Sequence, residues 1–178
     1  DSFDVHEPFH CPEPYASMYT DEDPRDPELP VWPPYATVKE SGYDKRELSF
    51  VRSQFAGKVT MVDRWFGRVL DRLDELSLWE DTVVVVTTDH GFSLGDHGWL
   101  AKNNGPVYQE IAHTPLFIWH PDRQVEQVDA LTSSVDVYST LLEGLGVEQP
   151  GHTHGESLIP LIRGETDTHR DSVLYGYF

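Results

Sequence analysis

The sequence predicts an α/β fold in which helices flank part of a mostly parallel sheet, and three stretches carry that prediction. Residues 82–88 read Thr-Val-Val-Val-Val-Thr-Thr, a β-branched run too short for a helix and typical of a strand buried on both faces. From about Asp44 to Trp79, apolar residues recur at three- and four-residue steps, which is the period of an amphipathic helix. Thr114–Pro121 is a second candidate for a buried strand. The helix followed by the valine strand forms half of a right-handed parallel crossover.

The opening of the chain has a different composition from the rest. Residues 1–34 hold most of the prolines, which exclude a long helix or a central strand there. The same region is too rich in aromatic side chains for a solvated tail. We therefore expect residues 1–42 to form an ordered loop packed on an α/β body of residues 43–178. Together they make a single domain, or a fragment of one, spanning residues 1–178.

Two more elements are expected near the end of the chain. Residues 133–146 start with Ser and Asp capping chemistry and stop at glycine, which predicts a helix. Val173–Phe178 is typical of a strand. His152 and His154 stand two apart, but no carboxylate or cysteine lies at ligand spacing, which favours a surface loop.

Charge and composition exclude several classes of function. The chain of 178 residues carries 13 basic and 31 acidic residues, and its net charge of −18 repels nucleic acid and anionic membranes. No stretch of the sequence resembles a signal peptide or a membrane span, and the sequence does not indicate a cellular compartment. A strongly charged surface keeps a protein soluble, and a halophilic source is one hypothesis for this acidity. A stability measurement that finds no gain in molar salt would reject it.

Polar, metal-competent residues follow the valine run directly. Asp89 and His90 stand at the expected carboxyl end of a strand, where open α/β sheets bind their ligands. A carboxylate and an imidazole are both good ligands for divalent metals. Gly91, Gly95 and Gly98 allow the backbone to turn tightly around such a centre. The sequence thus predicts an active-site rim at this point.

The string from residue 88 to 102 reads Thr-Asp-His-Gly-Phe-Ser-Leu-Gly-Asp-His-Gly-x-x-x-Lys. It closely resembles the metal-binding and lysine segment of the sulfatases, in the alkaline-phosphatase-like superfamily. His6-Glu-Pro-Phe9 resembles the His-x-Pro-aromatic stretch of the same family, and residues 108–118 and 136–142 are also similar to sulfatase segments. The likeness covers essentially the whole chain. It is strongest in members with an Asp-His metal pair.

The resemblance implies a role for each motif. Asp89 and His90 would ligate a divalent cation, commonly calcium in this family, with manganese or magnesium as open alternatives. Lys102 would hold a non-bridging sulfate oxygen, and His6 would stabilise or protonate the leaving alkoxide. His97 and His113 are further candidates for contact with the substrate. An anionic tetrahedral group needs cations preorganised where charge develops, so these roles make physical sense.

The nucleophile of the family pattern is missing from these residues. Sulfatases carry an Asp-Asp metal pair and a Cys-or-Ser-x-Pro-x-Arg motif nearer their N-terminus, whose Cys or Ser becomes formylglycine. Cys11 is followed directly by proline and by no arginine, so it is not that nucleophile. We therefore expect the chain to be the C-terminal portion of a longer sulfatase. It should be inactive, or nearly so, without its N-terminal half.

Three interpretations remain open. The leading one is a sulfuric-ester hydrolase that acts on a small-molecule or glycan sulfate ester. A phosphonate monoester or phosphodiester hydrolase of the same superfamily shares the Asp-His pair and the downstream lysine. The third is a non-catalytic, sulfatase-like binding module. The presence of His6, Asp89, His90 and Lys102 together argues against it, because such a module would not need all four. A missing half would also leave exposed surface through which the chain could dimerise.

Overall fold

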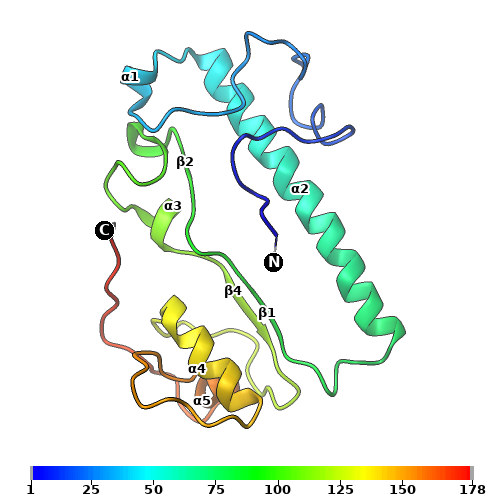
Figure 1. Cartoon of the computed structure of the whole chain (residues 1–178), viewed down its shortest axis with the longest axis vertical. Coiled ribbons are helices and arrows are strands. Elements are labelled where there is room, and N and C mark those ends of the chain that lie inside the picture. Colours follow the sequence, from blue (N-terminus) through cyan, green and yellow to red (C-terminus); the bar gives the residue numbers. More distant parts are fainter. Residues whose placement is uncertain (1, 177–178) are drawn as a thin grey trace. The chain divides into compact units, whose positions relative to one another are not determined.

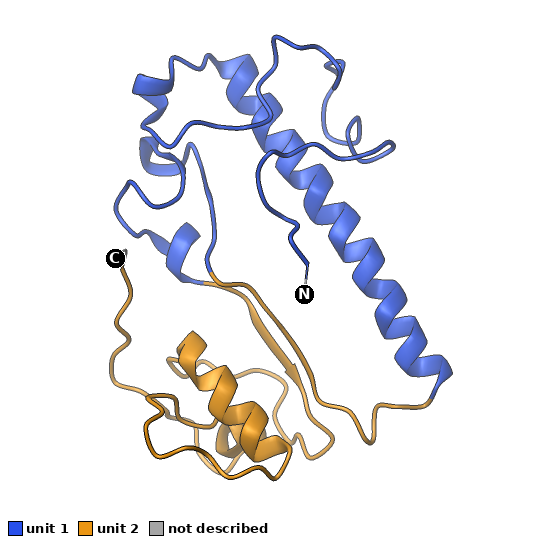
Figure 2. Ribbon diagram, in the orientation of Figure 1, with its two compact units in different colours: residues 1–76, 90–113 blue, residues 77–89, 114–178 orange. Residues whose placement is uncertain are grey.

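The structure is a computed structural model, and it describes residues 2–176 in two compact units (Figures 1 and 2). Unit 1 comprises Asp1–Leu76 and His90–His113, and unit 2 comprises Ser77–Asp89 and Thr114–Phe178. The chain crosses between the units three times, and one crossing falls between Asp89 and His90. No helix in the described part of the chain is both long and apolar enough to cross a membrane.

Unit 1 is built around α2 (Lys45–Glu75), the helix expected from residue 44 onward. Asp44 caps it: its carboxylate accepts the Glu47 backbone N–H at 2.9 Å, and the Glu47 carboxylate accepts the Asp44 N–H at 2.8 Å. Every fully buried residue of α2 lies between Phe50 and Lys58. The later apolar positions Trp65 and Val69 are more than half exposed.

The proline-rich opening packs on the first half of α2. Phe9 is completely buried, and its ring meets Phe55 of α2 edge-to-face, with 5.3 Å between the ring centroids. Gln54 donates from its side-chain amide to the Ala16 carbonyl at 2.8 Å. Gly57 permits the close approach, because a Cβ there would lie 2.4 Å from the Tyr15 carbonyl oxygen. The short helix α1 (Val38–Ser41) follows this segment.

Unit 1 also contains a small β-hairpin, and Lys102 follows its second strand. Strands β2 (Ser93–Leu94) and β3 (Leu100–Ala101) pair antiparallel around the 3-10 turn η1 (Asp96–Gly98). The helix α3 (Gln109–Ala112) comes next. The Gly91 N–H donates to the Ile111 carbonyl at 2.9 Å, and a Cβ on Gly91 would stand only 1.8 Å from the Glu110 carbonyl oxygen. Only glycine fits this contact with α3.

Unit 2 holds the valine strand. Strand β1 (Val84–Thr87) pairs antiparallel with β4 (Leu116–Trp119), and helices α4 (Ser134–Gly144) and α5 (Ile159–Ile162) follow (Figure 1). The core of unit 2 is a cluster of buried aliphatic residues in and just before α5: Leu158, Ile159, Leu161 and Ile162. Partly buried Leu116 and Ile118 of β4, together with Ala130, pack against this cluster. Both strands and the helix starting near Ser133 lie where the sequence predicts them.

The strand pairing differs from the expectation. A mostly parallel sheet is not confirmed, because both ladders among residues 2–176 are antiparallel. The valines of β1 are only partly buried, whereas the sequence predicts burial on both faces. A β-branched run favours an extended strand but does not determine the direction of its neighbour. The strand expected at Val173–Phe178 does not form over residues 173–176, and its last two residues lie outside the described part.

Candidate functional site

Two predicted site residues from opposite ends of unit 1 lie together. The Nζ atom of Lys102, which directly follows β3, stands 2.9 Å from Nε2 of His6 in the opening loop. Lys102 is 7% exposed, and His6 is half-buried. A buried ammonium is therefore held against an imidazole that solvent can still reach. Such a pair can bind an anionic oxygen and transfer a proton to a neighbouring one.

The hydrogen bonds of His6 define its tautomer. A lysine ammonium can only donate, so Nε2 accepts from Lys102. The other ring nitrogen, Nδ1, stands 2.7 Å from the Glu7 backbone carbonyl, which can only accept, so Nδ1 carries the proton. The Phe3 ring stacks on this imidazole, with 4.4 Å between the ring centroids. The resting site thus contains a neutral, oriented imidazole beside a charged lysine.

Glu7 is a buried carboxylate beside both of these residues. It is 2% exposed, and its Oε2 atom lies 3.3 Å from His6 Nδ1 and 3.5 Å from Lys102 Nζ. Its Oε1 atom accepts a hydrogen bond from the Tyr35 hydroxyl. Burial alone would raise the pKa of Glu7, but the Tyr35 bond, a backbone bond and the charge of Lys102 outweigh it and lower that pKa. Burial and the neighbouring Glu7 charge raise the pKa of Tyr35 to about 12.

A second lysine fixes the backbone of His6. Lys58, buried on α2, donates to the His6 carbonyl oxygen at 3.0 Å and to the Asp4 carboxylate at 2.5 Å. The opening loop is thereby tied to the helix at Asp4 and at His6 itself. Lys58 compensates the charge of Asp4 just as Lys102 compensates that of Glu7, as buried charges require.

The backbone around Lys102 adopts conformations that L-residues rarely occupy. Ala101 has φ 66° and Asn103 has φ 68°, so left-handed residues stand on both sides of the lysine. Asparagine tolerates this region, whereas alanine pays a steric cost there. Ala101 is nevertheless completely enclosed, at 1% exposure. Backbone strain of this kind persists where the surrounding structure imposes it, and it is common at functional sites.

The chain passes from unit 2 to unit 1 between Asp89 and His90. Asp89 is exposed at the end of the unit 2 segment and lies 3.3 Å from the Thr88 hydroxyl, which donates to its Oδ1. His90 is half-buried, and its Nδ1 stands 2.8 Å from the Gly91 carbonyl. Nδ1 therefore carries a proton, and a metal-ligating histidine commonly donates to a carbonyl from its non-ligating nitrogen in this way.

The donor chemistry of Asp89 and His90 suits a divalent cation, but these two do not make a complete site. Within residues 2–176, no group of three or more His, Cys, Asp or Glu side chains is arranged to hold a metal ion. Oxygen-ligand cations need six or more donors, and tetrahedral sites need four. The predicted pair supplies part of a metal site at most.

The remaining candidates lie on the surface of unit 1. His97 is exposed, stacks on Tyr108 with 4.0 Å between ring centroids, and approaches Glu110 at 3.3 Å. His113 is exposed and ends α3, where its N–H donates to the Gln109 carbonyl.

The environment of Cys11 does not favour a nucleophile. Burial raises the pKa of the Cys11 thiol, which disfavours the nucleophilic thiolate.

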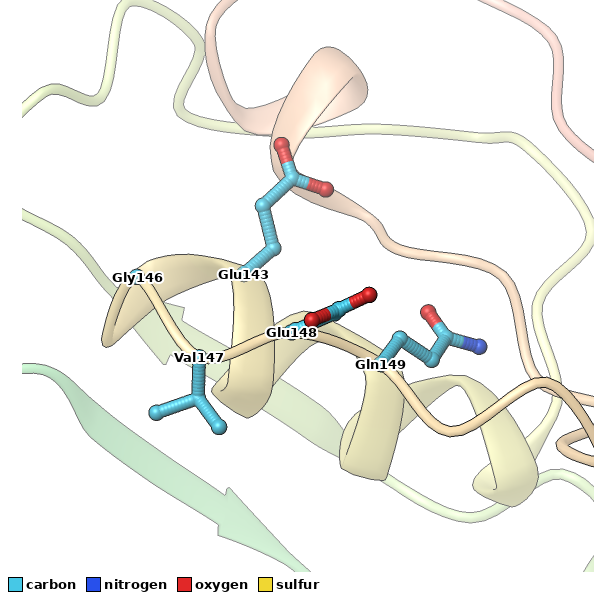
Figure 3. A pocket seen from close by; sticks show the side chains of 5 residues that line it. All are labelled: Glu143, Gly146, Val147, Glu148 and Gln149. Atoms are coloured by element: carbon cyan, nitrogen blue, oxygen red, sulfur yellow. The ribbon is translucent and has the colours of Figure 1, made fainter.

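Two hollows of the described chain lie elsewhere, in unit 2. One, of about 410 Å³, is lined by Glu143, Gly146, Val147, Glu148 and Gln149 at the end of α4, and Figure 3 shows the Glu143 side chain projecting from the helix there. Another, of about 700 Å³, lies beside α5. Neither hollow is lined by any of the predicted site residues, and carboxylates at both disfavour an anionic ligand.

The motifs predict His6 and Lys102 as site residues, and the structure brings the two side chains together, but no motif points to the residues that hold them. Glu7 is the middle residue of the His-x-Pro stretch, and a carboxylate directly after His6 is the one feature of the sequence that could have drawn attention to it. Tyr35 and Lys58 carry no motif at all. Their roles depend on contacts across 28 and 52 positions of the chain.

Comparison with known proteins identifies the family of the chain. The family model described as Sulfatase matches residues 3–147. The chain therefore belongs to the sulfatase family, as its motifs predict.

Similar proteins carry two kinds of name. The chain is 29% identical to an arylsulfatase of Clostridium perfringens, across 94% of this chain and 37% of the relative. It is 31% identical to the multifunctional alkaline phosphatase superfamily protein PehA of Trinickia caryophylli, across 97% and 38%. The phosphonate monoester hydrolase of Agrobacterium radiobacter superposes with a TM-score of 0.72 at 28% identity, across 89% and 36%. The chain thus spans little more than a third of the length of these proteins.

Proposed function

We propose that the chain is part of a hydrolase that cleaves sulfuric esters, and that it supplies the half of the active site that binds sulfate and protonates the leaving group. One observation carries the proposal: Lys102 and His6, 96 positions apart, meet at 2.9 Å in unit 1. Membership of the family supports the same activity. The overall reaction converts a sulfate ester and water into an alcohol, sulfate and a proton.

Lys102 binds a non-bridging oxygen of the sulfate group. Its ammonium is compact and strongly charged, and enclosure at 7% exposure strengthens its attraction for an anion. Since one of its N–H bonds points at His6 Nε2 before substrate arrives, a sulfate oxygen would compete with the imidazole for the lysine.

His6 protonates the leaving oxygen. When the S–O bond to the organic group breaks, its electron pair stays on that oxygen, which takes a proton from Nε2. His6 must therefore become an imidazolium first, with Nδ1 still donating to the Glu7 carbonyl. A proton donor of this kind typically contributes about 10²- to 10⁴-fold to the rate.

Asp89 and His90 contribute two ligands to a divalent cation, with calcium expected and manganese or magnesium as alternatives. The cation would polarise the ester when bound. The remaining ligands and the formylglycine nucleophile come from a segment that precedes these residues in the longer protein. The isolated 178-residue chain is then inactive, and this N-terminal segment is its main partner. His97 and His113 are the remaining candidates to contact the organic part of the substrate, for which a small molecule or a glycan is open.

A phosphonate monoester or phosphodiester hydrolase is the second candidate. The likeness to the Agrobacterium radiobacter phosphonate monoester hydrolase favours it. Both ester classes present anionic oxygens around a tetrahedral centre, so a lysine and a histidine suit either one. A non-catalytic binding module is the remaining alternative.

The test uses the full natural chain with 4-nitrophenyl sulfate and 4-nitrophenyl phenylphosphonate. We expect hydrolysis of the sulfate. Lys102→Ala should lower kcat/KM for 4-nitrophenyl sulfate by about 10²-fold or more. His6→Ala should lower kcat/KM by about 10²-fold or more for an alkyl sulfate, whose leaving group needs a proton. The matched control is Lys39→Ala, an exposed lysine of α1 that should leave kcat/KM unchanged. Faster cleavage of the phosphonate would favour the second candidate. Binding of a sulfate ester without turnover would favour the module.

A further inference from the structure

The Glu7 carboxylate stands out because one of its oxygens is buried without a hydrogen bond. Oε1 is held by Tyr35, but Oε2 has no hydrogen-bond partner in the structure, although the residue is 2% exposed. Buried carboxylate oxygens without hydrogen bonds are costly. Oε2 instead lies between two nitrogen atoms, 3.3 Å from His6 Nδ1 and 3.5 Å from Lys102 Nζ.

The proposed reaction creates a charge problem that Glu7 can solve. To protonate a leaving group, His6 must become a cation while Lys102 is also a cation, and the two nitrogens are only 2.9 Å apart. Two positive charges at that distance in a partly buried site repel strongly. A fixed negative charge within 3.5 Å of both cations offsets that repulsion.

The other charges around the pair do not replace Glu7. The buried Lys58 adds a further positive charge near the His6 backbone, and Asp4 is already bonded to Lys58. Tyr35 keeps its proton across the physiological range and so orients Glu7 without adding charge. Among the groups with described contacts at His6 and Lys102, Glu7 is the carboxylate that approaches both.

We propose that Glu7, oriented by Tyr35, is a positioning residue that allows His6 and Lys102 to be positively charged at the same time. This proposal rests on the proposed function, because its purpose is to prepare His6 for protonating a leaving group. Glu7 touches neither the ester nor the leaving oxygen. It acts through Nδ1 of the imidazole, while Nε2 faces Lys102 and the incoming group.

The first test measures the protonation of His6 directly and needs no turnover. Nitrogen NMR of the ¹⁵N-histidine-labelled full natural chain distinguishes the Nδ1–H tautomer from the imidazolium, and loss of a signal in His6→Gln assigns it. Glu7→Gln should lower the imidazolium-to-imidazole ratio of His6 by about tenfold at a fixed pH near 6.5. Tyr35→Phe should lower it by about threefold, because the carboxylate loses its orienting bond.

The matched control is Glu28→Gln, which removes the same charge from an exposed position in the same unit and should leave the ratio unchanged. A ratio in Glu7→Gln within twofold of the wild type would overturn the proposal. If Glu7→Gln fails to fold, Tyr35→Phe alone decides, since Tyr35 is an exposed residue and losing its hydroxyl removes no packing from the core.

The second test asks whether the charge matters for the reaction. In the full natural chain, Glu7→Gln should lower kcat by about 10²-fold for an alkyl sulfate, whose leaving group needs a proton. For 4-nitrophenyl sulfate, whose leaving group needs none, the loss should stay below about fivefold. Equal losses for both substrates would overturn the proposal. If the wild type hydrolyses neither ester, the proposed function fails, while the NMR ratio still decides the role of Glu7.

Discussion

Among residues 2–176, each unit contains one buried carboxylate beside cationic groups, and the hydrogen bonds of the two carboxylates differ greatly. In unit 2, Asp136 is completely buried and accepts from the backbone N–H groups of Ser133 and Glu156, from the Arg170 guanidinium and from His169. In unit 1, Glu7 has one oxygen bonded by Tyr35 and one with no hydrogen bond.

The difference indicates what each carboxylate is for. A carboxylate whose lone pairs are all occupied binds its segments together and has no capacity left for changes in charge. Asp136 joins the start of α4 to residues 156 and 169–170, and so acts as a structural junction. An oxygen left between a lysine and a histidine can respond when either one changes its charge or partner. Glu7 fits a working site, where incomplete satisfaction has a purpose.

The largest expected effect is on stability, from removing the junction in unit 2. Asp136→Ala leaves the partly buried Arg170 and two backbone N–H groups without their buried acceptor, which should cost about 3 kcal/mol. Hydrogen exchange of the α4 amides, read by mass spectrometry, reports this locally. Glu7→Gln, which keeps its volume and an acceptor for Tyr35, should change exchange in α4 negligibly. Equal protection of α4 in wild type and Asp136→Ala would refute the junction role.

Acid should weaken the same junction next. Burial opposes ionisation of Asp136, but the Arg170 bond, the two backbone N–H groups and His169 outweigh it and lower its pKa to about 2. An unfolded aspartate has a pKa near 4, so the unfolded state binds more protons between pH 4 and pH 2. The stabilisation is therefore fully present above about pH 4 and is lost as the pH falls toward 2, by roughly 2 kcal/mol. Urea titrations across this range test it, and Asp136→Asn should flatten the dependence.

Local elements of this fold follow from the sequence, whereas the pairing of distant segments does not. The period of apolar residues and the Asp44–Glu47 capping pair predict α2 closely, since both act within a few residues. The valine run predicts β1, but its antiparallel partner β4 lies about thirty residues away, and nothing in either strand specifies the direction of pairing.

The candidate site divides in the same way. The motifs of the family predict His6 and Lys102 as site residues, and their role at an anionic ester stays a prediction. The buried Glu7 and its Tyr35 contact could not be predicted, since a tyrosine hydroxyl in a proline-rich loop has many available partners. Asp89 and His90 are adjacent in sequence, yet they belong to different units. Their proposed role as joint metal ligands stays a prediction.

Substitutions at two glycines, one in each unit, can distinguish damage near the candidate site from damage near the Asp136 junction. A Cβ on Gly91 would stand 1.8 Å from the Glu110 carbonyl oxygen in unit 1, and one on Gly155 would stand 2.1 Å from the Val135 carbonyl oxygen in unit 2. Gly91→Ala and Gly155→Ala should each destabilise the protein by about 1–3 kcal/mol. We expect only Gly91→Ala to change the His90 signals in the nitrogen NMR spectrum. A change in His90 of the same size in Gly155→Ala would contradict the separation.

The smallest effect concerns the strained backbone before Lys102. Ala101 occupies the left-handed region at φ 66°, where an alanine Cβ costs about 1 kcal/mol relative to glycine. Ala101→Gly relieves that strain but adds freedom to the unfolded chain, so the net change in stability should lie within about 1 kcal/mol. The change should also loosen Lys102 and lengthen its contact with His6, raising KM for the ester more than it lowers kcat. Gly98→Ala, a substitution in open space at φ 78°, is the control for backbone strain away from the lysine. If Ala101→Gly leaves KM unchanged, the left-handed residue before Lys102 has no role in positioning it, and its conformation belongs to the hairpin alone.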